Sequence, residues 1–158
     1  MTAPRRGAPP LRPFGLVLHH DGRWSHEGHP IGNLKLREHF DRSVRFLPDE
    51  GCFVVTLRHF RGQIEVEEAG FFVREVLVER GLVRLSDGTE EALDLLSLEV
   101  SPRDGAWLCR VKRELVSGGV AARFSHAAQA ELANAIEFRA SGPAVFLGGR
   151  WVGLPDVD

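Results

Sequence analysis

The chain of 158 residues has no tyrosine, only two cysteines and no long apolar run. No hydrophobic stretch approaches the roughly 20 residues that a membrane-spanning helix needs, and the opening segment MTAPRRGAPPLRP contains no apolar signal-peptide core. We therefore expect a cytoplasmic protein without a membrane partner. Cys52 and Cys109 stand far apart in apolar runs, so we expect two buried, reduced thiols rather than a disulfide.

Lysine is also scarce, with two lysines against eighteen arginines, and the formal net charge is −2. Guanidinium groups suit phosphate and carboxylate recognition, but the arginines are scattered, as the codon usage of a GC-rich genome also produces. The chain contains no glycine-rich dinucleotide or phosphate-loop fingerprint and no Gly-x-Ser-x-Gly nucleophile elbow. Because no global positive field exists, we expect no nucleic-acid partner.

The apolar pattern predicts a mixed α+β chain. Short strand patterns separated by turn residues fill most of the sequence, and two helical patterns interrupt them, one over 34–46 capped by Asn33 and one capped by Ser125. The connections between strands are too short for helical crossovers, which favours antiparallel pairing. Residues 1–13 are rich in Pro, Gly and Arg, which predicts a mobile tail. DGRW at 21–24 and GGRW at 148–151 form a weak internal echo.

Four of the seven histidines lie within the segment HHDGRWSHEGHP. If Asp21-Gly22 is a two-residue hairpin turn, His19 faces Trp24, and His20 points to the opposite side of the hairpin from His19. These two histidines then cannot share a metal ion, and diagonal neighbours about 7–8 Å apart are poorly placed for zinc. We expect no metal site, whereas a structural hairpin and a ligand-binding edge both remain open.

A pair of carboxylates, Glu65 and Glu67, shares one face of the strand pattern QIEVEE. Paired carboxylates can perform acid–base chemistry or bind cations. Such a face is more commonly solvated or paired with arginines such as Arg61 and Arg74. Spacing alone brings no serine, cysteine or histidine to this pair, so the sequence predicts no catalytic set.

The order of several segments resembles the bacterial family called domain of unknown function 1285 (DUF1285). DGRWSHEGHPI, a short helix, FVVT and IEVEEAGFF follow the opening motifs of that family in order, and WLCRVKRELVSGGVAARFSHAAQAEL is similar to its second half. The resemblance runs from about Leu16 to Leu154. Asn33 stands where the family commonly has an arginine, which weakens any claim of phosphate binding.

This resemblance implies an α+β fold of two small lobes, 14–80 and 81–158. Each lobe would have a duplicated core of antiparallel strands plus one helix, and the second lobe would be loosely like a pleckstrin-homology domain. The resemblance further implies a crevice between the lobes that holds a small, nucleotide-like ligand, and a role in signalling.

We therefore predict a non-enzymatic ligand-binding or interaction module that needs no cofactor and holds a small anionic ligand between its lobes. Motif position and residue type assign six side chains to that ligand: Trp24 for stacking, His29, Arg37 and Arg123 for charge, and Glu65 and Glu67 for hydroxyl contacts. The alternatives are a hydrolase acting on a nucleotide or a small ester, and a protein–protein scaffold that uses an exposed strand edge. A homodimer is compatible with each alternative.

Overall fold

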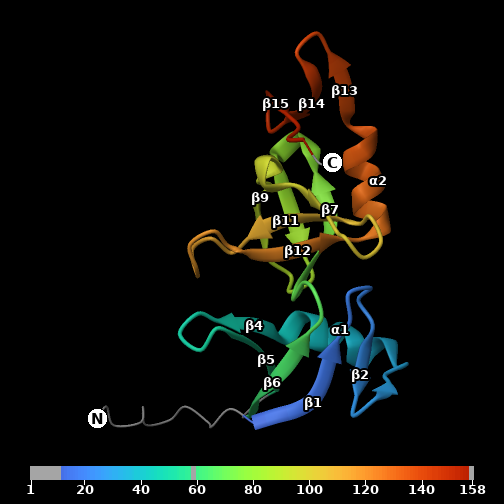
Figure 1. The fold of residues 1–158 in the computed structure, drawn as a ribbon, viewed down its shortest axis with the longest axis vertical. Helices are drawn as coiled ribbons and strands as arrows, with labels where there is room; N and C mark the ends of the chain where they lie inside the picture. Colours follow the sequence, from blue (N-terminus) through green and yellow to red (C-terminus); the bar gives the residue numbers. More distant parts are fainter. Residues whose placement is uncertain (1–11, 58–59, 157–158) are drawn as a thin grey trace. The chain divides into compact units, whose positions relative to one another are not determined.

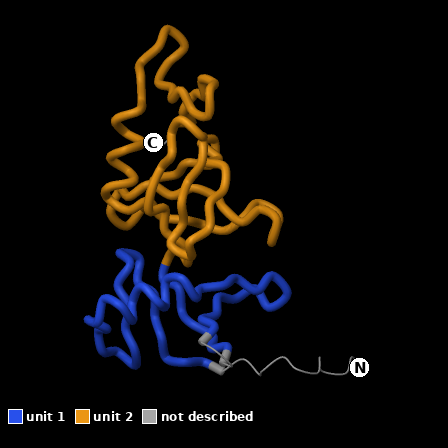
Figure 2. Tube along the Cα trace, turned by 180° about the vertical axis from the view of Figure 1, so that it is seen from behind, with its two compact units in different colours: residues 1–67 blue, residues 68–158 orange. Residues whose placement is uncertain are grey.

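The structure is a computed structural model that describes residues 12–57 and 60–156. The chain divides into two compact units, residues 1–67 and 68–158 (Figures 1 and 2). This division lies earlier than the predicted boundary between residues 80 and 81, because the strand over 71–77 pairs within the sheet of the second unit. Most of the predicted mobile tail lies outside the described residues, although Arg12 and Pro13 already belong to the first strand.

The first unit consists of one six-stranded sheet and one helix. The sheet has the order β3-β2-β1-β6-β5-β4. Its strands are β1 (Arg12–Leu18), β2 (Trp24–His26), β3 (His29–Pro30), β4 (Val44–Leu47), β5 (Cys52–Leu57) and β6 (Phe60–Val66).

Helix α1 (Leu34–Ser43) begins as predicted, with the Asn33 side chain accepting a hydrogen bond from the N–H of Leu36 at 3.0 Å. The helix ends earlier than expected because the next four residues, Val-Arg-Phe-Leu, form β4 and pair with β5. Branched and aromatic side chains favour this strand over a longer helix.

The second unit contains another six-stranded sheet, of order β10-β11-β12-β7-β8-β9, and a three-stranded sheet, β13-β14-β15. Helix α2 (His126–Asn134) is capped by Ser125, as predicted. Two short 3-10 helices are η1 (Val78–Arg80) and η2 (Leu95–Ser97). The strands are β7 (Phe71–Leu77), β8 (Leu82–Leu85), β9 (Glu90–Ala92), β10 (Glu99–Val100), β11 (Trp107–Val111), β12 (Val120–Phe124), β13 (Ile136–Arg139), β14 (Gly142–Leu147) and β15 (Arg150–Gly153).

The two six-stranded sheets share one topology. Each has two antiparallel meanders of three strands, and the first strand of the first meander pairs in parallel with the last strand of the second: β1 with β6, and β7 with β12. Adding six to each strand number of the first sheet gives the strand order of the second sheet, read from its β9 edge. The predicted two-lobed α+β fold with a duplicated core is therefore confirmed.

The expected antiparallel pairing is wrong at the centre of each sheet. Within each meander the connections are too short for a parallel crossover, but the parallel partners are the first and last strands of a repeat. The whole intervening chain serves as their connection, which satisfies the length that parallel pairing needs.

The sequence echo does not mark this duplication. DGRW joins β1 to β2 in the first sheet, whereas GGRW joins β14 to β15 in the separate three-stranded sheet. In the repeat, the connection equivalent to β1–β2 is the one from β7 to β8, which contains η1. The likeness of the second unit to a pleckstrin-homology domain stays a prediction.

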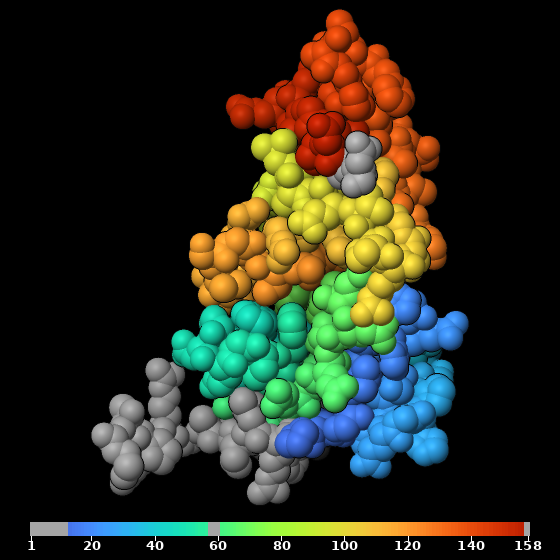
Figure 3. Space-filling model, in the orientation of Figure 1, coloured from blue at the N-terminus to red at the C-terminus, as the bar shows by residue number. Residues whose placement is uncertain are grey.

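Each unit has its own buried core. Trp24 and Val54 are among the most buried side chains of the first unit, and Phe71 and Leu132 among those of the second. In the second unit, Gly81 lies against Gly148, so that the three-stranded sheet (orange and red in Figure 3) packs beside η1. No helix among the described residues is long and apolar enough to cross a membrane.

Both cysteines are free thiols, as predicted. Cys109 is buried, and its burial, together with nearby carboxylates, raises the pKa of its thiol to about 12. Cys52 is only half-buried, which corrects the expectation that both would be fully buried.

Candidate functional site

The hairpin between β1 and β2 has a three-residue loop, His20–Gly22, instead of the two-residue turn expected from Asp21-Gly22. The N–H of Gly22 donates to the carbonyl of His19 at 3.0 Å, and the N–H of His19 donates to the carbonyl of Arg23 at 2.8 Å. Gly22 has a φ of 88°, the left-handed conformation that closes such a loop with a bulge.

The extra loop residue shifts the register of the hairpin by one. Leu18, not His19, pairs with Trp24, and every side chain of β2 changes face relative to the predicted hairpin. Trp24 thereby enters the core, where it is 1% exposed and its indole N–H donates to Asp41 at 2.8 Å. Ser25, the next residue along β2, points to the opposite face of the strand.

Glu67 meets both histidines of the loop. Because β1 and β6 are parallel and Leu18 pairs with Val66, the residues that follow these two strands leave the sheet at the same end. Nδ1 of His19 lies 2.9 Å from Oε2 of Glu67, and Nδ1 of His20 contacts the other carboxylate oxygen. Both histidines thus reach one carboxylate, although alternation along the predicted hairpin was expected to place them on opposite faces, because loop residues need not alternate between faces as strand residues do.

The same cluster extends to a serine hydroxyl, since Nε2 of His19 lies 2.8 Å from Oγ of Ser25. Hydrogen bonds with His19 and then His20 lower the pKa of Glu67 from 4.5 to about 2. The ionised carboxylate can only accept hydrogen bonds, so Nδ1 of each histidine is the donor. A neutral His19 then carries a lone pair on Nε2, and the Ser25 hydroxyl must donate to it.

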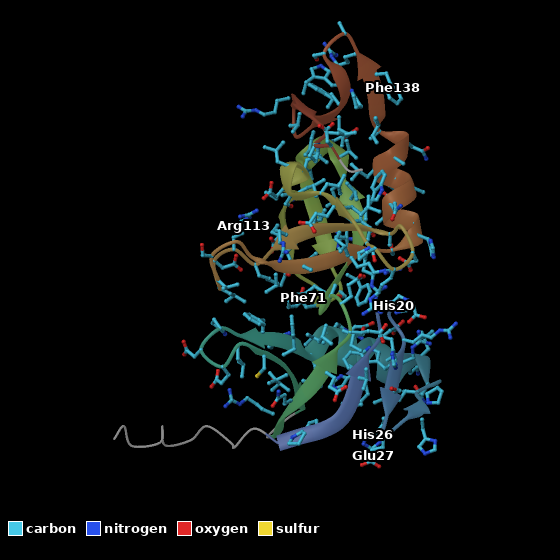
Figure 4. All side chains as sticks on the ribbon, viewed as in Figure 1. His20, His26, Glu27, Phe71, Arg113 and Phe138 are labelled. Atoms are coloured by element: carbon cyan, nitrogen blue, oxygen red, sulfur yellow. The ribbon has the colours of Figure 1, made fainter. Side chains whose placement is uncertain are left out.

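A polar pocket of about 360 Å³ opens over this cluster. Arg23 uses Nε for an ion pair with Asp21 at 3.3 Å, and within the described residues its two terminal nitrogens have no partner. Figure 4 labels His20 at the loop end of the hairpin and His26 and Glu27 at its opposite end, and the pocket extends from that loop to Gly28 and Pro30. The lining residues are His19, His20, Asp21, Arg23, Trp24, Ser25, Gly28 and Pro30.

Of the six side chains assigned from the sequence, the structure brings two to this pocket. Trp24 is one of the lining residues, whereas Glu67 does not line the pocket and reaches it only through its contacts with His19 and His20. His29 and Glu65 are exposed on β3 and β6 and do not line the pocket. Arg37 lies on α1, where its Nε is buried without a hydrogen-bond partner among the described residues.

The sixth residue, Arg123, lies on β12 in the second unit and is 7% exposed. Its guanidinium donates to Glu68 at 3.0 Å and to Asp104. These two carboxylates raise the pKa of Arg123 despite the opposing effect of burial. The side chain thus belongs to a buried network of its own unit.

Ser25 and Arg23 were not predicted as site residues. The signal was present in the segment HHDGRWS, but it depends on loop length: a three-residue loop places His19 and Ser25 together, and a two-residue turn separates them. No group of three or more His, Cys, Asp or Glu residues in the described parts of the chain is arranged to hold a metal ion.

A second pocket of about 420 Å³ lies elsewhere in the first unit and is almost entirely apolar. It is formed by β1, β2 and α1 and offers a single polar side chain, that of His26. Its lining residues are Phe14, Leu16, His26, Ile31, Leu36 and Phe40.

Comparison with known proteins supports the resemblance at the level of the fold. No protein-family model matches the sequence, and no curated protein matches it either. The chain is similar to a solved DUF1285 family protein from Silicibacter pomeroyi DSS-3, with a TM-score of 0.64 and 18% identity over 94% of this chain and 84% of that one. A DUF1285 family protein from Shewanella baltica OS155 matches with a TM-score of 0.50 and 14% identity, over 76% of this chain and 91% of that one. The chain therefore has a DUF1285-like fold.

Proposed function

We propose that the chain is a ligand-binding module that holds a small anionic ligand in the polar pocket of its first unit and acts in signalling through that ligand. The observation that carries this proposal is the convergence of two imidazoles, a guanidinium and a hydroxyl on one concave surface. Small-molecule sites typically have volumes of about 300–1,000 Å³ and a few convergent polar groups. The crevice between the two units that the resemblance implies stays a prediction.

Arg23 supports an anion as the ligand. The terminal nitrogens of its guanidinium are unpaired within the described residues, and a guanidinium fork matches the oxygens of a carboxylate or phosphate. Pro30 is exposed and supplies apolar surface in the same pocket, which suits the flat part of a nucleotide-like ligand.

A scaffold that adds a partner strand is less well supported. The outer strands of the two six-stranded sheets are β3, β4, β9 and β10, and each has only two to four residues. Short edge strands offer few unpaired backbone groups to an added strand.

Calorimetric titration with AMP, pyrophosphate and adenosine tests this proposal. We expect AMP and pyrophosphate to bind, adenosine to bind more weakly, and Arg23→Gln to weaken AMP binding by about tenfold or more, since a hydrogen bond to a charged group is worth about 1.5–3 kcal/mol. Arg42→Gln is the matched control, because Arg42 is exposed on α1 and does not line the pocket. Equal AMP affinity in R23Q and the unmutated chain, or no binding of either anion to the folded chain, would overturn the proposal.

A further inference from the structure

Three side chains of the first unit form a continuous hydrogen-bonded line. Oγ of Ser25 lies 2.8 Å from Nε2 of His19, and Nδ1 of the same ring lies 2.9 Å from Oε2 of Glu67. The line runs from hydroxyl to imidazole to carboxylate, and each ring nitrogen of His19 is engaged. Ser25 is 8% exposed, and both it and His19 line the polar pocket.

This arrangement meets the geometric requirement for an activated nucleophile. Such a hydroxyl needs a base within about 2.6–3.2 Å, and that base must be oriented by a third group on its other nitrogen. The ionised state of Glu67 fixes the required tautomer of His19, in which Nε2 can accept the serine proton. The other described serines with hydrogen bonds, such as Ser43 and Ser101, bond to backbone groups or to a carboxylate.

We propose that Ser25 is the nucleophile, His19 the general base and Glu67 the positioning carboxylate of an acyl-transfer site whose substrate is a small ester bearing an anionic group. This inference rests on the pocket of the proposed function and deepens it, because the bound ligand is then a substrate.

The reaction balances with water as the only co-reactant. Ser25 Oγ forms a bond to the ester carbonyl carbon while its proton passes to Nε2 of His19. The carbon–oxygen bond to the leaving alcohol then breaks, and that oxygen takes the proton from His19. Water attacks the acyl-serine, gives a proton to His19, and releases the acid as Oγ recovers its proton; the net change is ester plus water to acid plus alcohol.

Charge stabilisation in this pocket falls to Arg23. Its side chain lines the cavity beside Ser25 and His19, and donors aimed at developing negative charge are a major part of catalysis in acyl transfer. Arg23 is also the group that would hold the anionic substituent of the ester, which selects charged over neutral esters.

A fluorophosphonate probe tests the nucleophile directly in the full chain. Attack by Ser25 forms a serine–phosphorus bond and releases fluoride, so intact mass should rise by one adduct, and peptide mapping should place it on Ser25. Ser25→Ala should abolish the adduct. Ser117→Ala and His126→Asn are matched controls, since both residues are exposed in the second unit, and both variants should label as the unmutated chain does.

The role of Glu67 is tested by the pH profile of labelling. The labelling rate should rise with pH through a single titration, and Glu67→Gln should slow it about 100-fold and move the midpoint of that titration. A merely structural role for Glu67 would change the amount of folded protein, which circular dichroism reports, but would leave the midpoint in place.

Mapping the adduct on the unmutated chain needs no variant to fold. No adduct on Ser25, or an adduct on another serine alone, would overturn the acyl-transfer inference, and binding of AMP or pyrophosphate in the same sample would leave the proposed function standing. Labelling of Ser25 without binding of either anion would overturn the proposal of an anionic ligand, and the assignment of Ser25 as the nucleophile would stand. An unshifted midpoint in E67Q would show that Glu67 is not the positioning carboxylate of His19.

Discussion

At the scale of single residues, the candidate site depends on the charge of Glu67. One carboxylate accepts hydrogen bonds from two imidazoles, and this keeps it ionised down to a pKa of about 2. That charge fixes the proton on Nδ1 of His19 and leaves Nε2 for Ser25. If Glu67 were protonated, its carboxyl could itself donate a hydrogen bond, and the proton of His19 would no longer be fixed on Nδ1.

The lowered pKa of Glu67 predicts how stability depends on pH. A carboxyl whose pKa is about 2 in the folded chain and near its ordinary 4.5 in the unfolded chain stabilises the fold fully above the higher value and loses that contribution as pH falls toward the lower one. The difference in free energy of unfolding between the unmutated chain and E67Q should therefore stay constant above about pH 5 and shrink below it, as urea unfolding at several pH values would measure. A difference that does not change across this range would contradict the hydrogen-bonded carboxylate.

Local residue chemistry predicted the helix starts but not the site. Asn33 and Ser125 cap their helices as expected, because an N-cap depends on a side chain and a backbone N–H three residues away. The hairpin register depends on whether its loop has two or three residues, and Asp21-Gly22 fits both. One residue of difference turned Trp24 inward and brought Ser25 to His19.

At the scale of elements, one ion pair ties together the two meanders of the second sheet. Lys112 follows β11, and its Nζ lies 2.7 Å from Asp87 and 2.9 Å from the Thr89 hydroxyl, in the turn between β8 and β9. The side chains of Lys112 and Asp87 are only 10% and 4% exposed. Burial opposes the charge of Asp87, but the hydrogen bonds from Lys112 and Thr89 prevail and lower its pKa.

Asp87→Asn tests this link. Removing one partner of a buried pair leaves the other charge uncompensated, so we expect a loss of about 3–5 kcal/mol in the free energy of unfolding, measured by urea denaturation. Glu90→Gln is the control, because its partner Arg84 is exposed and such a pair contributes about 0–1 kcal/mol. Equal losses in D87N and E90Q would show that the buried pair contributes no more than a surface one.

At the scale of the whole molecule, the duplicated sheet explains how residues distant in the sequence meet at the site. In each repeat, a parallel pair joins the first and last strands. In the first repeat this pair is β1–β6, so the loop after β1 and the residue after β6 share one end of the sheet. Strand existence, helix order and the mixed α+β class follow from the spacing of apolar residues, whereas the two lobes were implied by the family resemblance. The parallel closure does not follow from that spacing, because no local pattern distinguishes it from an antiparallel neighbour, and Glu67 was therefore not linked to His19.

The protonation of His19 tests the whole arrangement without any ligand. Nitrogen-15 NMR of the imidazoles at about pH 9, where ordinary imidazoles are neutral, reports which ring nitrogen carries the proton. We expect the proton of His19 on Nδ1, with Nε2 unprotonated, and a loss of this preference in E67Q. A proton on Nε2 in the unmutated chain would contradict the Ser25–His19–Glu67 line and the site built on it.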